Sequence, residues 1–306
     1  MFDVLIIGGG PAALAAAIYF ARQKMSFVIL TENIGGQTLL SSDVENYLGF
    51  HLLDGNALVK KFREHLADYT NAFTLREQEP VTNLESINGL FRATTVKGWY
   101  DGKTVLIATG TKHRELGVAG EREYYGKGVT YCAACDAPLF REKVVTVVGG
   151  GNSAMDAALF TEKYAKRVAL VTINGDLSGD EGMKHKVRSS QRITIAVSTK
   201  TTKIIGEKVV TGIGLVGADG RERIEQTDGV FIEIGLQPVV DFVGMVAKDR
   251  WGQIVIDKHN ATSVPGIWAA GDVTDVTEKQ IAVAVGEGSK AALEIVRYFQ
   301  TTPITD

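Results

Sequence analysis

The chain has 306 residues, a formal net charge of −3, 45% hydrophobic residues and 23% charged residues. This composition is ordinary for a globular protein, and a length above about 250 residues predicts two domains. No long basic or acidic run favours nucleic-acid or membrane-surface binding, and no apolar stretch reaches the roughly 18 residues of a membrane span. The first residues lack the features of a secretion signal, so we expect no membrane or nucleic-acid partner and a cytoplasmic location.

The chain begins with a predicted strand over residues 4–7 and a predicted helix over residues 14–21. The loop between them, GGGPAA at residues 8–13, has the G-x-G-x-x-A spacing of dinucleotide-binding folds. The helix N-terminus offers free N–H groups and a positive dipole end to phosphates. The pattern therefore predicts a dinucleotide site at this loop.

Each residue of this loop has a distinct expected role. Gly8 permits the tight turn, and Gly10 lets the backbone approach a pyrophosphate. Pro11 belongs to the same candidate site, and Ala13 is small enough for close packing of helix on strand. A second strand is predicted over residues 27–30 and is followed by Glu32. This side chain either binds a ribose hydroxyl or is a solvated loop carboxylate.

The two cysteines of the chain, Cys132 and Cys135, are three positions apart. A disulfide framework needs more bridges, and a zinc site needs two further ligands. A lone C-x-x-C is more often redox-active than structural. The alternative is half of a zinc site that a dimer completes.

A second glycine loop, GGGNSA at residues 149–154, lies between a predicted strand over residues 144–148 and a predicted helix over residues 155–160. Two such loops in context predict two dinucleotides, whereas the alternative is a pair of glycine turns in an ordinary α/β protein. The candidate residues for the second nucleotide are Gly149, Gly151, Asn152, Ser153 and Ala154.

Two candidate hinges follow predicted strands over residues 104–107 and 229–233. We therefore predict an α/β fold of two Rossmann-like dinucleotide-binding domains, with the second inserted into the first. The first domain is expected over residues 1–112 and 241–306, and the inserted domain, which carries the cysteines, over residues 113–240.

These motifs occur in an order that resembles the low-molecular-weight thioredoxin reductase family, class II of the pyridine nucleotide-disulfide oxidoreductases. The body is most similar to the flavoprotein subunit of alkyl hydroperoxide reductase, without the N-terminal thioredoxin-like module of that protein. The motifs are the two glycine loops, Gly35-Gly36-Gln37, Glu45-Asn46-Tyr47, Ala108-Thr109-Gly110, Cys132-Ala-Ala-Cys135-Asp136, Ala270-Gly271-Asp272, Glu278-Lys279-Gln280-Ile281 and Gly286-Glu287-Gly288.

The resemblance implies that residues 1–112 and 241–306 form an FAD-binding domain and that residues 113–240 form a nicotinamide-nucleotide-binding domain. Asn46 is expected near the isoalloxazine ring, Asp272 near the ribityl or pyrophosphate region, and the helix start at Ile281 near the pyrimidine end. The other residues matched to this cofactor are Gly8, Gly10, Pro11, Ala13, Gly36, Gln37, Thr109, Gly110, Gly271, Lys279 and Gln280.

The resemblance also assigns the dithiol roles. Cys135 is expected to face the flavin, Cys132 to attack the partner disulfide, and Asp136 to carry protons. Asp136 is alternatively a helix N-cap. In the family the inserted domain rotates between the two steps, and we expect the same here.

The electron donor is the open point. NADPH-using members carry a basic cluster after the second strand of the inserted domain, which is residues 168–171 here. The first basic residue is Lys184, so NADPH is disfavoured and NADH is preferred, with Asp176 or Asn174 near the ribose. Ferredoxin or a deazaflavin remains an alternative donor.

The expected acceptor is thioredoxin, a glutaredoxin-like protein or a peroxide-reductase module. A homodimer is carried over from the family. Two other functions stay open, namely a ferredoxin– or flavodoxin–nicotinamide reductase and a flavin-bound redox sensor without turnover. The C-x-x-C-Asp run argues against the first, because such relatives lack the pair.

Overall fold

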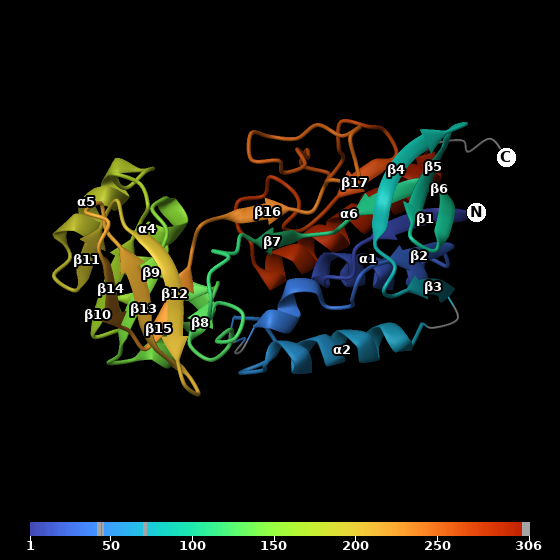
Figure 1. Cartoon of the computed structure of the whole chain (residues 1–306). Coiled ribbons are helices and arrows are strands. Elements are labelled where there is room, and N and C mark those ends of the chain that lie inside the picture. Colours follow the sequence, from blue (N-terminus) through green and yellow to red (C-terminus); the bar gives the residue numbers. More distant parts are fainter. Residues whose placement is uncertain (42–43, 45, 70–71, 302–306) are drawn as a thin grey trace. The chain divides into compact units, whose positions relative to one another are not determined.

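The computed structural model describes residues 1–41, 44, 46–69 and 72–301. Two compact units make up the chain (Figure 1): unit 1 is Met1–Lys112 with Gln237–Asp306, and unit 2 is His113–Leu236. The chain passes between the units twice, and the short strands on these two connections pair with each other. They are β7 (Thr111–His113) and β16 (Leu236–Pro238).

Unit 1 is built on a seven-stranded sheet of order β3-β2-β1-β6-β5-β4, with β17 paired to β6. The pairs among β1, β2, β3, β6 and β17 are parallel, and β4, β5 and β6 form an antiparallel meander. The strands are β1 (Phe2–Ile7), β2 (Phe27–Leu30), β3 (Phe73–Arg76), β4 (Val81–Ile87), β5 (Leu90–Thr95), β6 (Gly98–Ile107) and β17 (Ile267–Ala269).

The helices of unit 1 are α1 (Pro11–Arg22), η1 (Gly36–Leu40), α2 (Gly55–Ala67) and α6 (Ile281–Thr301). Figure 1 shows α6 alongside α1 next to the sheet. The two helices approach closely because Gly288 has no side chain. A Cβ at this position would lie 2.0 Å from the carbonyl oxygen of Ala12. The last helix of the chain is thus packed directly on the first glycine loop.

Unit 2 has a five-stranded parallel sheet of order β11-β10-β9-β15-β8 and a three-stranded antiparallel sheet of order β12-β13-β14. The strands are β8 (Val129–Thr130), β9 (Val144–Val148), β10 (Arg167–Val171), β11 (Ile193–Ala196), β12 (Lys200–Gly206), β13 (Val210–Val216), β14 (Glu222–Gln226) and β15 (Gly229–Ile232). The helices are α3 (Ala133–Asp136), η3 (Ala137–Phe140), α4 (Asn152–Thr161) and α5 (Glu181–Ser189).

The predicted fold class is confirmed, since each unit is an α/β layer structure around a largely parallel sheet. The predicted helix starts were too late, because α1 begins at Pro11 and α4 at Asn152. The preceding glycines, Gly10 and Gly151, are extended and serve as N-caps, so each helix begins inside its loop. The strand predicted to end at Glu233 ends one residue earlier. Among the described residues, no helix combines the length and hydrophobicity needed to cross a membrane.

Candidate functional site

The first glycine loop leaves open space at the N-terminus of α1. Gly8 has φ +118°, and a Cβ there would lie 2.2 Å from the carbonyl oxygen of Ala108. By contrast, no atom of the described residues lies within 4 Å of the Cβ position of Gly10. The helix has no side-chain cap, and Pro11 at its start lacks an N–H group. Uncapped amides beside an open backbone position fit a pyrophosphate.

Residues of η1 lie against this loop. The amide of Gly35 donates to the carbonyl of Gly9 at 2.7 Å, and a Cβ on Gly36 would lie 3.4 Å from the Cα of Gly10. Gln37 donates through Nε2 to the carbonyl and hydroxyl oxygens of Thr111, at 2.7 and 2.8 Å. The structure therefore brings the predicted pair Gly36 and Gln37 to the open side of the first loop.

The predicted Thr109-Gly110 turn follows β6. The hydroxyl of Thr109 donates to the carbonyl of Val239 at 2.7 Å, and Gly110 has φ +67°. Glu32, predicted to reach a ribose, is exposed and lies after β2, where its carbonyl accepts the amide of Gln78 at 3.1 Å.

The Gly271-Asp272 turn also reaches the first loop. Gly271 has φ +78°, and a Cβ there would lie 3.1 Å from the Cβ of Ala12. Burial raises the pKa of Asp272, an effect that the Lys279 ammonium opposes. Burial lowers the pKa of Lys279 itself, whose Nζ donates to the carbonyl of Thr274 at 2.6 Å. A carboxyl and an ammonium thus lie partly buried next to the dinucleotide loop.

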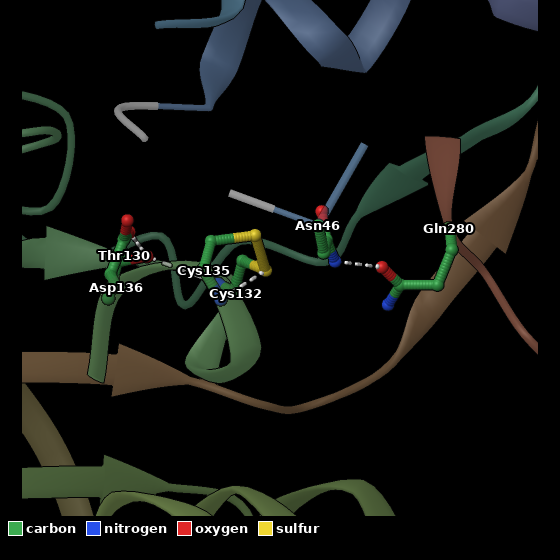
Figure 2. The surroundings of a disulfide bond; sticks show 6 residues. All are labelled: Asn46, Thr130, Cys132, Cys135, Asp136 and Gln280. Atoms are coloured by element: carbon green, nitrogen blue, oxygen red, sulfur yellow. Dashed lines mark hydrogen bonds between the residues drawn. A yellow bond between two sulfur atoms is a disulfide. The ribbon is translucent and has the colours of Figure 1, made fainter. Parts of the chain in front are cut away.

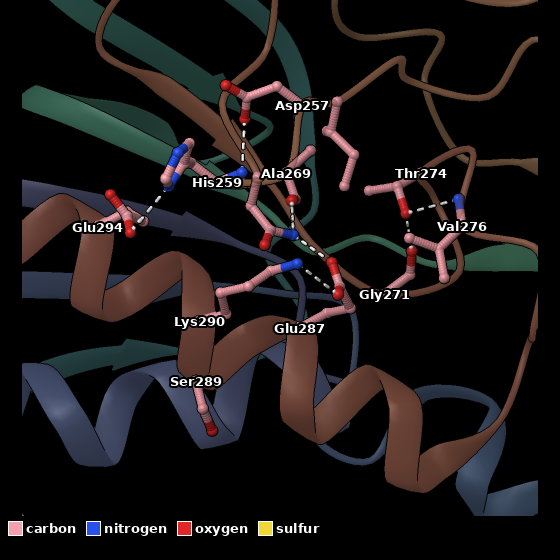
Figure 3. A network of polar contacts seen from close by, with 12 residues as sticks. Asp257, His259, Ala269, Gly271, Thr274, Val276, Glu287, Ser289, Lys290 and Glu294 are labelled. Carbon is pink, nitrogen blue, oxygen red and sulfur yellow. Dashed lines mark hydrogen bonds and ion pairs between the residues drawn. The ribbon is translucent and has the colours of Figure 1, made fainter.

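A polar network fixes this turn and α6 together (Figure 3). The hydroxyl of Thr274 donates to the carbonyl of Gly271 at 2.8 Å. The buried amide of Asn260 donates to the carbonyl of Ala269 at 3.0 Å and to Glu287 of α6. Lys290 pairs with Glu287 at 2.9 Å. Hydrogen bonds through Asn260 therefore connect β17, the strand before the Gly271 turn, to α6.

Two predicted flavin contacts meet at the start of α6. Asn46 donates through Nδ2 to Oε1 of Gln280 at 3.0 Å (Figure 2). The carbonyl of Gln280 accepts the amide of Ala284, so Gln280 precedes the first turn of the helix that begins at Ile281. Both side chains are exposed, and Gln280 directly precedes the first residue of α6.

The two cysteines of unit 2 form a disulfide (Figure 2). Cys132 is the N-cap of α3, and its Sγ accepts the amide of Cys135 at 3.2 Å. Both cysteines are partly exposed. The zinc alternative needs free thiolates, whereas these sulfurs are bonded to each other. Among the described residues, no group of three or more potential ligands could hold a metal ion.

Asp136 is the last residue of α3. Its carboxylate accepts a hydrogen bond from the hydroxyl of Thr130, which in turn accepts the amide of Cys132 at 3.1 Å. Cys132 is the N-cap of α3, whereas Asp136 occupies the N-cap position of η3 without a capping hydrogen bond from its side chain. Thr130 connects the aspartate to the first cysteine, and sequence reasoning missed it because a lone threonine two residues before a cysteine carries no motif.

Aromatic residues lie next to the cysteines in unit 2. The Tyr131 ring stacks on His113 with centroids 4.9 Å apart, and its hydroxyl donates to buried Glu121 at 2.8 Å. Burial lowers the pKa of His113 and raises that of Tyr131. Burial and the Asp136 charge raise the pKa of Tyr125 to about 12. Both tyrosines therefore stay protonated over the working pH range.

The second glycine loop repeats the geometry of the first. Gly149 has φ +149°, and Gly151 is the N-cap of α4 without a side-chain cap. However, groups of the loop already have partners within the chain. The carbonyl of Gly150 accepts the amide of Ser178 at 2.7 Å, and Oδ1 of Asn152 accepts the amide of Asp180 at 2.8 Å.

The segment after β10 contains Asp176, which was predicted to lie near a ribose. Asp176 is exposed and forms an ion pair with Arg188 of α5 at 2.5 Å. The hydrogen bond from Arg188 lowers the pKa of Asp176. The sequence placed the nearest basic residue at Lys184, whereas helix α5 brings Arg188 back to the strand end. Neighbours of this kind, twelve residues apart, become visible only in the fold.

In each unit a glycine loop follows a parallel strand, and unit 2 also carries the C-x-x-C disulfide. This arrangement is typical of the class of dinucleotide-dependent disulfide oxidoreductases. The family model described as pyridine nucleotide-disulphide oxidoreductase matches residues 2–288, and the chain belongs to this family. The resemblance inferred from the motif order is therefore confirmed.

Two curated proteins and one solved structure are similar to this chain. The chain is 37% identical over 305 residues to a protein named NADH dehydrogenase from Bacillus subtilis, covering 97% of this chain and 58% of that protein. It is 39% identical over 298 residues to the F subunit of alkyl hydroperoxide reductase of Pseudomonas putida, covering 95% and 57%. The thioredoxin reductase structure from Streptococcus pyogenes matches with a TM-score of 0.91, 34% identity and 99% coverage of both chains. The chain thus spans less than two thirds of these two curated relatives.

Proposed function

We propose that the protein is a thioredoxin reductase-like flavoenzyme. Electrons pass from a reduced donor, NADH in preference to NADPH, through FAD and the Cys132–Cys135 pair to a protein disulfide such as thioredoxin. The observation that carries this proposal is the disulfide at the start of α3, with Asp136 joined to the Cys132 amide through Thr130. The names of the P. putida and S. pyogenes relatives support a disulfide or peroxide pathway, and that of the B. subtilis relative supports NADH.

The first unit fits FAD. The open Gly10 position and the uncapped start of α1 suit the pyrophosphate, and Asp272 lies on the neighbouring turn. Gln37 and the Asn46–Gln280 pair supply amide groups for a polar ring edge. When bound, FAD would supply the two-electron chemistry that links oxidation of the donor to reduction of the disulfide.

The cysteines carry the dithiol chemistry. Two electrons break the Sγ–Sγ bond, and the two sulfurs take up two protons, for which Asp136 is the proposed carrier. The Cys132 thiolate then attacks the partner disulfide, which gives a mixed disulfide and one partner thiol. Cys135 attacks the Cys132 sulfur, restores the Cys132–Cys135 bond and releases the second partner thiol.

An anaerobic titration of the purified protein tests the donor and the cofactor together. Flavin absorbance is followed while NADH, NADPH or reduced ferredoxin is added. We expect bleaching by NADH at a lower concentration than by NADPH. Bleaching by NADPH at much lower concentration contradicts the preference, and purified protein without flavin contradicts the proposed function.

A second candidate keeps the same dithiol centre but uses ferredoxin or another donor that is not a nicotinamide. A specific observation favours it: Ser178 and Asp180 occupy polar groups of the second glycine loop, and the Ser178 hydroxyl also donates to Gly150 at 3.2 Å. A nicotinamide dinucleotide has to displace or share these contacts. In the titration, bleaching by reduced ferredoxin alone supports this candidate.

We also infer a homodimer and a cytoplasmic location, by analogy with the family. Sedimentation of the purified protein tests the first inference. A monomer at concentrations well above those of the activity assay contradicts it.

A further inference from the structure

Tyr131 directly precedes Cys132 and is anchored through its side chain. The strand before it, β8, lies at the edge of its sheet and is two residues long. An edge strand of this length holds the residues that follow it weakly. The Tyr131 hydroxyl, by contrast, donates to the carboxylate of Glu121 at 2.8 Å, and Glu121 is 1% exposed. A hydrogen bond to a buried group therefore fixes the chain where it enters the redox segment, residues 132–136.

Glu121 is itself fixed on two sides. Its two carboxylate oxygens accept the amides of Leu116 and Gly117 at 2.8 and 2.7 Å. Gly117 has φ +70°, a conformation that lets successive N–H groups converge on one anion. The residue before Glu121 is Gly120, where a Cβ would lie 2.0 Å from the carbonyl oxygen of Ile204 on β12. The carboxylate thus connects the redox segment to the antiparallel sheet of unit 2.

The ring of Tyr131 makes further contacts within unit 2. It stacks on His113 with centroids 4.9 Å apart, and the Tyr125 ring is tilted against it at 5.6 Å. Burial first, and then the hydrogen bond to Glu121, raise the pKa of Tyr131, so its hydroxyl keeps its proton and remains a donor near neutral pH. A variant that loses the hydroxyl alone keeps these ring contacts.

Cys132 needs a defined backbone because it both caps α3 and carries the disulfide. Its Sγ is bonded to that of Cys135 and accepts the Cys135 amide at 3.2 Å. Closing a disulfide within one chain depends on the effective concentration of the two sulfurs for each other, which is high when the backbone holds them close. Since Cys132 follows Tyr131 directly, losing the Tyr131 anchor lowers this effective concentration.

We propose that Tyr131 is a positioning residue of the redox centre, which together with Glu121 holds Cys132 where its bond to Cys135 forms. The inference rests on the proposed function only in that the pair cycles between disulfide and dithiol. The anchor acts on the equilibrium between these two states, whereas proton transfer is assigned to Asp136.

The test measures this equilibrium without any electron donor. The full chain is equilibrated anaerobically near neutral pH with mixtures of reduced and oxidised dithiothreitol. Each reduction breaks the Cys132–Cys135 bond, closes one dithiothreitol molecule to its cyclic disulfide and moves two hydrogen atoms to the cysteines. After an acid quench, the free thiols are labelled with N-ethylmaleimide and counted by mass spectrometry.

Three variants are compared with wild type. Tyr131→Phe removes the hydroxyl and keeps the ring on His113. Glu121→Gln removes the carboxylate that accepts this hydroxyl. Tyr124→Phe is the matched control, because the Tyr124 hydroxyl donates to the carbonyl of Gly206 at 2.7 Å in the same unit.

We expect the equilibrium of Tyr131→Phe to lie about threefold to tenfold further toward the dithiol than that of wild type. Glu121→Gln should move in the same direction, and Tyr124→Phe should match wild type. The proposal is overturned if Tyr131→Phe coincides with wild type or moves toward the disulfide, if Tyr124→Phe moves equally, or if folded Glu121→Gln does not move. Tyr131→Phe and its control decide alone should Glu121→Gln fail to fold. Because the reductant is chemical, inactivity with every donor would contradict the proposed function and leave this result standing.

Discussion

Replacing Glu233 with Gln should stabilise unit 2 increasingly as the pH rises. Burial raises the native pKa of this carboxyl to about 8 from a reference value of 4.5. Its raised pKa contributes stability that is fully present below the unfolded value and is lost as the pH rises to about 8. Between pH 6 and pH 8 the native state holds a proton that the unfolded chain has released, and each pH unit lowers the free energy of unfolding by about 1.36 kcal/mol.

Because the proton is released gradually around pH 8, the loss in wild type adds up to about 2.7 kcal/mol between pH 6 and pH 9, and Glu233→Gln does not show this loss. Urea unfolding at about pH 6 and about pH 9, followed by circular dichroism, measures the change in this difference. Fluorescence of Trp99, Trp251 and Trp268 provides an internal control, because all three lie in unit 1. Glu207→Gln, the same substitution at an exposed position between β12 and β13, is the control for net charge. The reasoning is refuted if the stability difference between wild type and Glu233→Gln does not change with pH, or if Glu207→Gln shows an equal change.

Three further outcomes are expected. Gly288→Ala should destabilise unit 1 by about 2 kcal/mol in a thermal melt and weaken flavin retention, because the new Cβ meets the Ala12 carbonyl. Gly286→Ala, which has open space in the same helix, is the control and should be neutral or slightly stabilising. Asp136→Asn should slow protein-disulfide reduction by about a hundredfold at unchanged flavin content, and wild-type turnover would exclude its proton role. Cys135→Ser should lose protein-disulfide reduction but keep donor-dependent dye reduction; loss of both activities would contradict the order of electron transfer.

The sequence predicted the parts of the site that depend on local pattern. The loops at residues 8–13 and 149–154 were recognisable because tight turns between strand and helix require glycine at fixed positions. The cysteine pair was recognisable from its spacing. The exact starts of α1 and α4 were not, because an extended glycine N-cap and a helical first residue leave no periodic signal.

Partners that come from distant segments could not be predicted. Glu233 has no motif of its own, although the fold places its carbonyl oxygen against Gly149 of the second glycine loop. Arg188 of α5 pairs with Asp176 in the segment that follows β10. The amide of Ser178, in the same segment, meets the carbonyl of Gly150, 28 positions earlier. In each case a backbone crossover decides the contact, and crossovers are not encoded within a short window of sequence.

The packing of α6 on α1 has a consequence for how the protein is made. Unit 2 is one continuous stretch, His113–Leu236, so all of its strands have left the ribosome before unit 1 can be completed. Unit 1 needs β17 beside β6 and Gly288 beside Ala12, and the ribosome supplies β17 and α6 after unit 2. During synthesis the domain with the cysteines therefore folds first, and the first glycine loop waits for α6. A nascent chain stalled before residue 281 should hold a folded unit 2 and an unfinished flavin site.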